Sequence, residues 1–235
     1  MSVGISEDPL GFVPGNLRDA VSRALAAGRA DDRATQTSGS DGGSRDRHPG
    51  HPLRRRVVFG AGIGSMDVEY SAFGENPDLR GRGRRLDESL TQLTDLWSGQ
   101  DVLMPSGERV RMLPTPVQQP RIPVWCAGRW PNRPGLRRAA RWDGVVATFA
   151  DAGQAIPVPV DDFADVVRYV ASERGSLDGF DIGLEGWTSP DNAAEVISPN
   201  VAAGLTWWIE AMGWWRGGVD DARHRIVAGP PGQSA

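Results

Sequence analysis

The chain has 235 residues, a formal net charge of −4 at pH 7 and an isoelectric point near 5.4, which excludes the strongly basic surface that nucleic-acid binding requires. All 26 basic residues are arginine, so a lysine Schiff base is excluded as a catalytic device. No stretch approaches the roughly 20 apolar residues of a membrane span, and the first residues lack the pattern of a signal peptide. The sequence therefore predicts a cytoplasmic protein that acts on a small-molecule substrate, with no nucleic-acid and no membrane partner.

The only cysteine, Cys126, cannot form an internal disulfide, which suits a reducing compartment. It lies in the middle of an apolar run. Free cysteine is among the most buried residue types, so we expect a core residue rather than a nucleophile.

The organisation of the chain changes near residue 53. Asn16–Ala27 has the apolar spacing of a short amphipathic helix, and residues 28–52 then lack large apolar side chains and are predicted to be disordered. His48 and His51 lie in this segment without acidic or cysteine partners at ligand spacing, so no metal site is expected. The predicted organisation is a largely disordered segment over residues 1–53, a β/α barrel portion over 54–231 and a tail over 232–235.

After residue 53, strand and helix patterns alternate, as in a parallel α/β protein. The predicted strands are apolar runs, at Arg56–Ala61, Val124–Ala127, Val145–Phe149, Phe180–Trp187 and Leu205–Ile209. The predicted helices are Arg84–Trp97, Pro134–Arg141, a helix capped by Asp161 that ends at Gly175, one from Asp191 that Pro199 interrupts or ends, and Val219–Ala228. The proline-punctuated segment Gln100–Pro123 predicts a loop with a short hairpin.

The segment Ile122–Ala147 reads as strand, glycine turn, helix and strand. Gly128 interrupts the apolar run, and a helix follows near Pro134. The backbone N–H groups at such a turn point at one spot and bind phosphate well.

These residues resemble the luciferase-like flavin- or deazaflavin-dependent oxidoreductases, which fold as (β/α)8 TIM barrels. Four further stretches agree in order: RRVVFGAGIGS (Arg55 to Ser65), EYSAFGE with RGRRLDESLTQLTDLWSG (Glu69 to Gly99), GLTWWIEAM (Gly204 to Met212) and DDARHRIVAGPP (Asp220 to Pro231). The resemblance implies a TIM-type barrel in which about five β/α units are recognisable. It also implies FMN or a deazaflavin as cofactor, and either reaction of reduced flavin with oxygen or hydride transfer. Neither cofactor is favoured over the other.

The resemblance also implies the cofactor site. The cofactor phosphate is expected at the turn Ala127, Gly128, Arg129 and Trp130, through backbone N–H groups and the arginine. The glycine loop Gly60, Gly62 and Gly64 is expected to border the cofactor ring. Trp187, at the end of a strand, is expected to line a pocket. No acid–base pair or nucleophile stands out, which fits a family whose cofactor carries the chemistry; the catalytic residues are unknown.

Two other readings compete with this one. The first is a barrel remnant or subunit without cofactor chemistry, because three β/α units expected before Val57 are not recognisable. Five strands would leave two apolar edges exposed, so the chain should oligomerise, aggregate or bind flavin poorly. A change of reading frame upstream of Arg54 would explain why these units are not recognisable. The second, an aldolase- or isomerase-like barrel, is disfavoured because lysine is absent and no carboxylate motif ends a strand.

Overall fold

The computed structural model describes residues 57–149, 158–212 and 217–229. The helix predicted over Asn16–Ala27, the disorder predicted over residues 28–52 and the histidine pair lie outside these residues. The described residues fall into two compact units. The first contains Gly60–Gly62 and the chain from Val124 onward, and the second contains the described residues up to Phe59 and from Ile63 to Pro123.

A five-stranded sheet forms the centre of the first unit. It consists of β1 (Phe59–Ala61), β4 (Val124–Trp130), β5 (Gly144–Phe149), β6 (Asp181–Gly186) and β7 (Trp207–Glu210), which are neighbours in the order β1-β4-β5-β6-β7. Strands β4 to β7 are parallel. All five predicted strands are therefore present, although their ends differ by a few residues.

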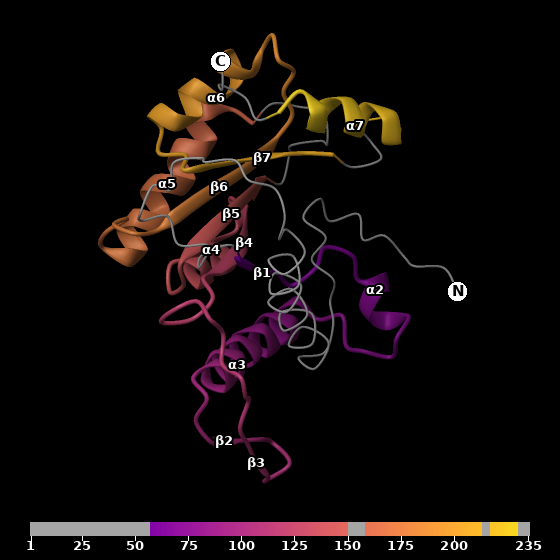
Figure 1. Ribbon diagram of the computed structural model, residues 1–235, viewed down its shortest axis with the longest axis vertical. Coiled ribbons are helices and arrows are strands. Elements are labelled where there is room, and N and C mark those ends of the chain that lie inside the picture. The colour runs from indigo at the N-terminus through magenta and orange to yellow at the C-terminus, as the bar shows by residue number, and fades with distance from the viewer. Residues whose placement is uncertain (1–56, 150–157, 213–216, 230–235) are drawn as a thin grey trace, which may run out of the picture. The chain divides into compact units, whose positions relative to one another are not determined.

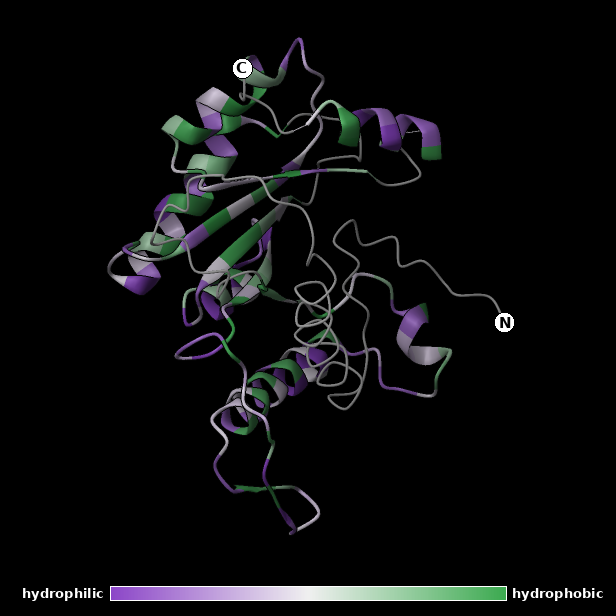
Figure 2. Cartoon of the chain, in the orientation of Figure 1, coloured by the Kyte–Doolittle hydropathy of each residue, from purple (hydrophilic) through white to green (hydrophobic). Residues whose placement is uncertain are grey.

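Helices follow these strands and lie along one face of the sheet (Figure 1). They are α4 (Arg133–Ala139), α5 (Val160–Arg174) and α6 (Ala193–Ala202), whereas α7 (Val219–Val227) lies apart from them, near the end of β7. The buried residues of α5 are Phe163, Val166 and Val170, spaced to fall on one side of the helix, as predicted. Figure 2 shows that the strands are mostly hydrophobic and that α7, which has no buried residue, is largely hydrophilic.

Two predictions of helix ends are wrong. Asp161 is not the N-cap of α5, because the helix begins one residue earlier and Pro159 precedes it; Asp161 lies in the first turn. Pro199 does not end α6, which continues to Ala202. The predicted end of α5 is confirmed, since Gly175 has a φ of 86° in the left-handed region that glycine favours.

The packing of α4 against β4 depends on two glycines. A Cβ at Gly128 would lie 2.4 Å from Leu136 Cδ2, and one at Gly135 would lie 2.9 Å from the Ala127 carbonyl oxygen. Neither distance is compatible with a side chain, so glycine at both positions allows the helix to approach the strand closely.

The two faces of the sheet differ. Trp207 contacts Trp125 with ring centroids 5.4 Å apart, whereas Trp208 packs over Gly186, where a Cβ would be 2.0 Å from the indole. These two tryptophans therefore point to opposite faces, because side chains alternate along a strand. Cys126 is fully buried, as predicted.

The second unit contains α2 (Val68–Ser71), α3 (Leu79–Trp97) and a two-stranded antiparallel hairpin of β2 (Val102–Leu103) and β3 (Arg109–Val110). The hairpin in this proline-rich segment was predicted. Helix α3 begins five residues before the predicted start, because Asp78 caps it by accepting a 2.6 Å hydrogen bond from the Gly81 N–H. Leu90, Leu93, Leu96 and Trp97 form its buried side.

The parallel sheet with helices along one face is an α/β barrel-like arrangement. No helix among the described ranges is long and apolar enough to cross a membrane.

Candidate cofactor site at the carboxyl ends of the strands

The carboxyl ends of parallel strands gather at one edge of the sheet, which is where barrel enzymes build their active sites. Gly60 lies in β1, next to β4, and Gly62 follows that strand. Ala127 to Trp130 form the carboxyl half of β4, and Trp187 directly follows β6. The structure therefore brings these predicted site residues to a single edge of one sheet.

The prediction that Gly128 ends the strand is wrong. Strand β4 pairs with β5 as far as Trp130, which lies opposite Phe149. The chain leaves the sheet at Pro131, and Asn132 precedes α4. Gly128 is buried against Leu136, so close helix packing accounts for its lack of a side chain without any ligand.

The strand register reveals a polar row at this edge. Arg129 lies beside Thr148, and the pairing of Ala147 with Leu184 places Thr148 level with Glu185. Because side chains alternate along strands, these three share the face of Trp125, opposite to α4. Arg129 is exposed, and Thr148 and Glu185 are half-buried. A cation, a hydroxyl and a carboxylate are thus presented side by side. Thr148 and Glu185 were missed, because sequence alone does not give register.

Arg133 lies just beyond β4, between two aromatic rings. Its guanidinium carbon is 4.0 Å from the centre of the Trp130 ring and 4.2 Å from that of Tyr169 in α5. Sequence reasoning missed this cluster, because Tyr169 is far from the other two residues in the chain.

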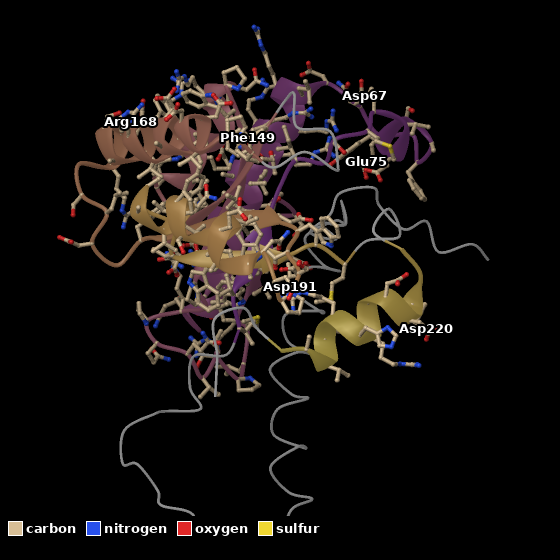
Figure 3. All side chains as sticks on the ribbon, turned by 90° about the horizontal axis from the view of Figure 1, so that it is seen from above. Asp67, Glu75, Phe149, Arg168, Asp191 and Asp220 are labelled. Atoms are coloured by element: carbon tan, nitrogen blue, oxygen red, sulfur yellow. The ribbon has the colours of Figure 1, made fainter. Side chains whose placement is uncertain are left out.

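Gly64 belongs to the second unit, and its loop is fixed by buried polar contacts. The Ile63 carbonyl accepts hydrogen bonds from the Tyr70 hydroxyl at 2.8 Å and from Arg82 Nη1 at 3.2 Å. Arg82, with a side chain 1% exposed, also pairs with Asp67 at 2.6 Å and lies over the Tyr70 ring. Asp67 and Glu75 flank α2 (Figure 3).

Two properties of this loop follow from these contacts. Burial raises the pKa of Tyr70, so the hydroxyl stays protonated and donates a hydrogen bond to the Ile63 carbonyl oxygen. Gly64 has a φ of 68° and leaves room for the Tyr70 hydroxyl, which would be 3.0 Å from a Cβ there. These contacts support the backbone conformation of the loop at Gly64.

A carboxylate with little exposure lies at the end of β7, the edge strand farthest from β1. Glu210 ends β7 and accepts hydrogen bonds from the Thr188 N–H at 2.7 Å, the Thr188 hydroxyl at 2.6 Å and Trp208 Nε1 at 2.9 Å. Arg225 of α7 completes the set at 3.2 Å, and the paired side chains are only 10% and 15% exposed. Burial acts to raise the pKa of Glu210, but the bonds from Thr188, Trp208 and Arg225 together outweigh it and lower the pKa.

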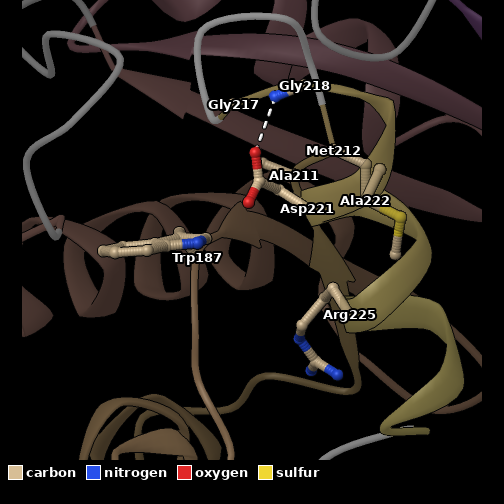
Figure 4. Close-up of a pocket in the computed structure, with 8 residues that line it drawn as sticks. All are labelled: Trp187, Ala211, Met212, Gly217, Gly218, Asp221, Ala222 and Arg225. Carbon is tan, nitrogen blue, oxygen red and sulfur yellow. Dashed lines mark hydrogen bonds between the residues drawn. The ribbon is translucent and has the colours of Figure 1, made fainter.

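This network borders a small pocket of about 50 Å³ (Figure 4). Trp187, Met212, Asp221 and Arg225 are among its lining residues, and Asp221 accepts a 2.7 Å hydrogen bond from the Gly218 N–H. Trp187, which is 52% exposed, is one of the lining residues, and its expected role at the cofactor stays a prediction. The pocket has room for little more than a water molecule or two.

The chain is similar to several known proteins. The family model of luciferase-like monooxygenases matches residues 54–226. The chain is 32% identical over 82 residues to the oxygenase component of a flavin-dependent trigonelline monooxygenase from Acinetobacter baylyi, a match covering 33% of this chain and 22% of that protein. It is 18% identical to the crystal structure of the monooxygenase RslO1 from Streptomyces bottropensis, with a TM-score of 0.43 over 74% of this chain and 48% of that one.

The chain therefore spans about a fifth of the length of the curated relative and about half of the solved chain. The family match alone covers well over half of this chain, from the glycine loop to α7. The chain belongs to the luciferase-like monooxygenase family.

Proposed function

We propose that the chain is a flavin- or deazaflavin-dependent oxidoreductase of the monooxygenase type. The observation that carries this proposal is the row Arg129, Thr148 and Glu185 at the carboxyl edge of a parallel sheet in which β1, with Gly60, is the neighbour of β4, in a chain of this family. When bound, the cofactor would supply the redox chemistry. The residues of this edge would bind and orient it.

The donors and acceptors of this edge suit the polar part of a flavin. Arg129 and the backbone where β4 meets α4 would bind the phosphate, because a guanidinium makes charge-assisted hydrogen bonds to phosphate oxygens. Thr148 and Glu185 present groups that can exchange hydrogen bonds with the hydroxyls of a ribityl chain. Gly60 and Gly62 of the same unit would border the ring, and Trp187 would line the far end of the site. FMN and deazaflavins share the hydroxyls and the phosphate, so these residues suit either cofactor.

The fold would derive from the eight-stranded barrel of the family. We propose that the chain carries about five of its β/α units within residues 54–231, as a barrel portion between an N-terminal segment and a short tail. Strands β1 and β7 would then be the two edges of the sheet, and a second copy of the chain is the expected partner for them. The cytoplasmic location stays a prediction.

Fluorescence titration with FMN, riboflavin and a deazaflavin tests the proposal. We expect saturable binding that Arg129→Ala weakens by about tenfold, the value of one charge-assisted hydrogen bond. Arg111→Ala is a matched control, because this exposed arginine lies outside the sheet and pairs only with Asp101. If no flavin binds at micromolar concentrations, the alternative is correct: a barrel remnant or subunit without cofactor chemistry.

A further inference from the structure

Helix α7 is attached to the strand ends through few contacts. None of its residues is buried, so it gains little of the packing energy that stabilises most helices. Among the residues that the structure describes, the hydrogen bonds that join α7 to the strand ends all come from Arg225. Its Nη2 donates to Glu210 at 3.2 Å and to the Thr188 hydroxyl at 3.3 Å. This one side chain therefore supplies most of what keeps α7 in place.

The turn that leads into α7 has the properties of a hinge. Gly217 has a φ of 139°, a conformation that residues with a side chain rarely adopt. Asp221 accepts a 2.7 Å hydrogen bond from the Gly218 N–H, which fixes Gly218 to the first turn of the helix. Rotation of the backbone at Gly217 would thus move Gly218 and α7 together. Residues at the ends of elements commonly absorb such rotations.

One wall of the pocket at the strand ends is formed by α7 (Figure 4). Trp187 follows β6 and is 52% exposed, Met212 lies two residues beyond β7 and is 44% exposed, and Ala222 and Arg225 of α7 line the same pocket. Its volume of about 50 Å³ is far below the several hundred Å³ of a site for a small organic molecule. Outward movement of α7 would remove this wall. The indole and the thioether would then offer a surface that suits an aromatic ring.

We propose that α7 is a hinged flap held shut by Arg225, and that its opening admits a planar apolar group to Trp187 and Met212. A ligand that binds only the open form shifts the equilibrium toward that form. Under the proposed function, on which the identity of this ligand rests, the planar group belongs to the substrate. The cofactor phosphate is expected at the end of β4, so α7 takes no part in holding it.

Hydrogen exchange followed by mass spectrometry measures the opening of α7. The amides of α7 should exchange faster than those of α5, whose apolar side is buried. Arg225→Ala removes charged hydrogen bonds, so it should speed exchange in α7 by roughly ten- to a hundredfold and leave α5 unchanged. Arg223→Ala is the matched control, because this exposed arginine of the same helix pairs with Asp220 within α7. Equal exchange of α7 in both variants would overturn the proposal.

A binding measurement separates a flap from a helix that only frays. Prodan, an uncharged naphthalene dye whose fluorescence changes on binding, is the planar probe. Apparent affinity is proportional to the fraction of protein in the open form, so Arg225→Ala should strengthen dye binding by the factor by which it speeds exchange in α7. Trp187→Ala should abolish dye binding. In the wild type, saturating dye should itself speed exchange in α7, which tests the coupling without altering Arg225.

Two results would overturn the flap. One is faster exchange of α7 in Arg225→Ala without tighter dye binding, and the other is dye binding that Trp187→Ala leaves unchanged. Flavin titration reports separately on the proposed function. A wild type that shows the coupled dye binding but binds no flavin overturns the proposed function and leaves the flap standing. A wild type that binds flavin, with dye binding that does not depend on Arg225, overturns the flap alone.

Discussion

Strands β4 and β7 point the same way in the sheet, but the charged residues at their carboxyl ends are used in opposite ways. At the end of β7, Glu210 is buried, and both of its oxygens accept hydrogen bonds from the protein. At the end of β4, Arg129 and Arg133 are exposed, and Arg133 is held by aromatic rings rather than by a carboxylate.

The difference separates a structural charge from a ligand-binding charge. A buried charge whose hydrogen bonds are all made within the protein has nothing left to offer a ligand, and its loss is felt as instability. An exposed arginine that aromatic rings orient, as they orient Arg133, contributes little to folding and can bind an anion. Substitutions at the two strand ends should therefore change different measurable quantities.

Glu210→Ala should give the largest loss of stability. It leaves the half-buried Arg225 without its carboxylate and removes the acceptor of two Thr188 donors, which should lower the free energy of unfolding by about 3–5 kcal/mol. Urea denaturation followed by tryptophan fluorescence measures it. Glu210→Gln keeps an acceptor and should lose less. A loss below about 1 kcal/mol in Glu210→Ala would mean that the network does not fasten α7 to β7.

Gly128→Ala tests whether packing alone explains this glycine. The added Cβ would meet Leu136 Cδ2 at 2.4 Å, so the strand and α4 must separate, and the expected loss is about 1–3 kcal/mol. Gly218→Ala is the matched control, because its φ of −86° suits alanine and its nearest neighbour would be 3.8 Å away. Equal stabilities of both variants would contradict the close approach of α4 to β4.

Much of the sheet could be predicted, because buried parallel strands are apolar runs between helical patterns. The ends of the elements could not. A glycine in an apolar run predicts a turn, yet Gly128 is there because Leu136 of the next helix packs on it, and that contact is invisible in the sequence. Likewise, Pro199 predicts a helix end, but α6 continues through it.

The site was predictable as an edge of the sheet but not as a set of side chains. The register of three strands places Arg129, Thr148 and Glu185 side by side, and this register depends on tertiary packing. The stacking of Arg133 on Tyr169 joins two helices, and the bonds of Glu210 to Thr188 and Arg225 join β7 to residues outside that strand. A charged residue that directly follows the apolar run of β7 was the one visible signal for Glu210.

Lowering the pH should destabilise the contacts at the carboxyl end of β7 before those at the carboxyl end of β4. The folded-state pKa of Glu210 is lowered from its ordinary value of 4.5, so its contribution to stability is complete above that value and is lost as the pH falls through the folded pKa. The free energy of unfolding of the wild type should therefore fall more steeply below pH 4.5 than that of Glu210→Gln. Denaturation curves at a series of pH values give both slopes, and parallel slopes would contradict the lowered pKa.

Arg129→Ala should have the smallest effect on stability, within about 0.5 kcal/mol, because exposed side chains contribute little to folding. The same variant should weaken flavin binding by about tenfold. Measuring both quantities on one preparation sharpens the contrast with Glu210→Gln, which should lower stability and leave the affinity of the remaining folded protein unchanged. If Arg129→Ala instead lowers the free energy of unfolding by more than about 2 kcal/mol, the guanidinium supports the fold. The carboxyl end of β4 would then be closed by its own contacts, as the end of β7 is, and the cofactor phosphate would have to bind elsewhere.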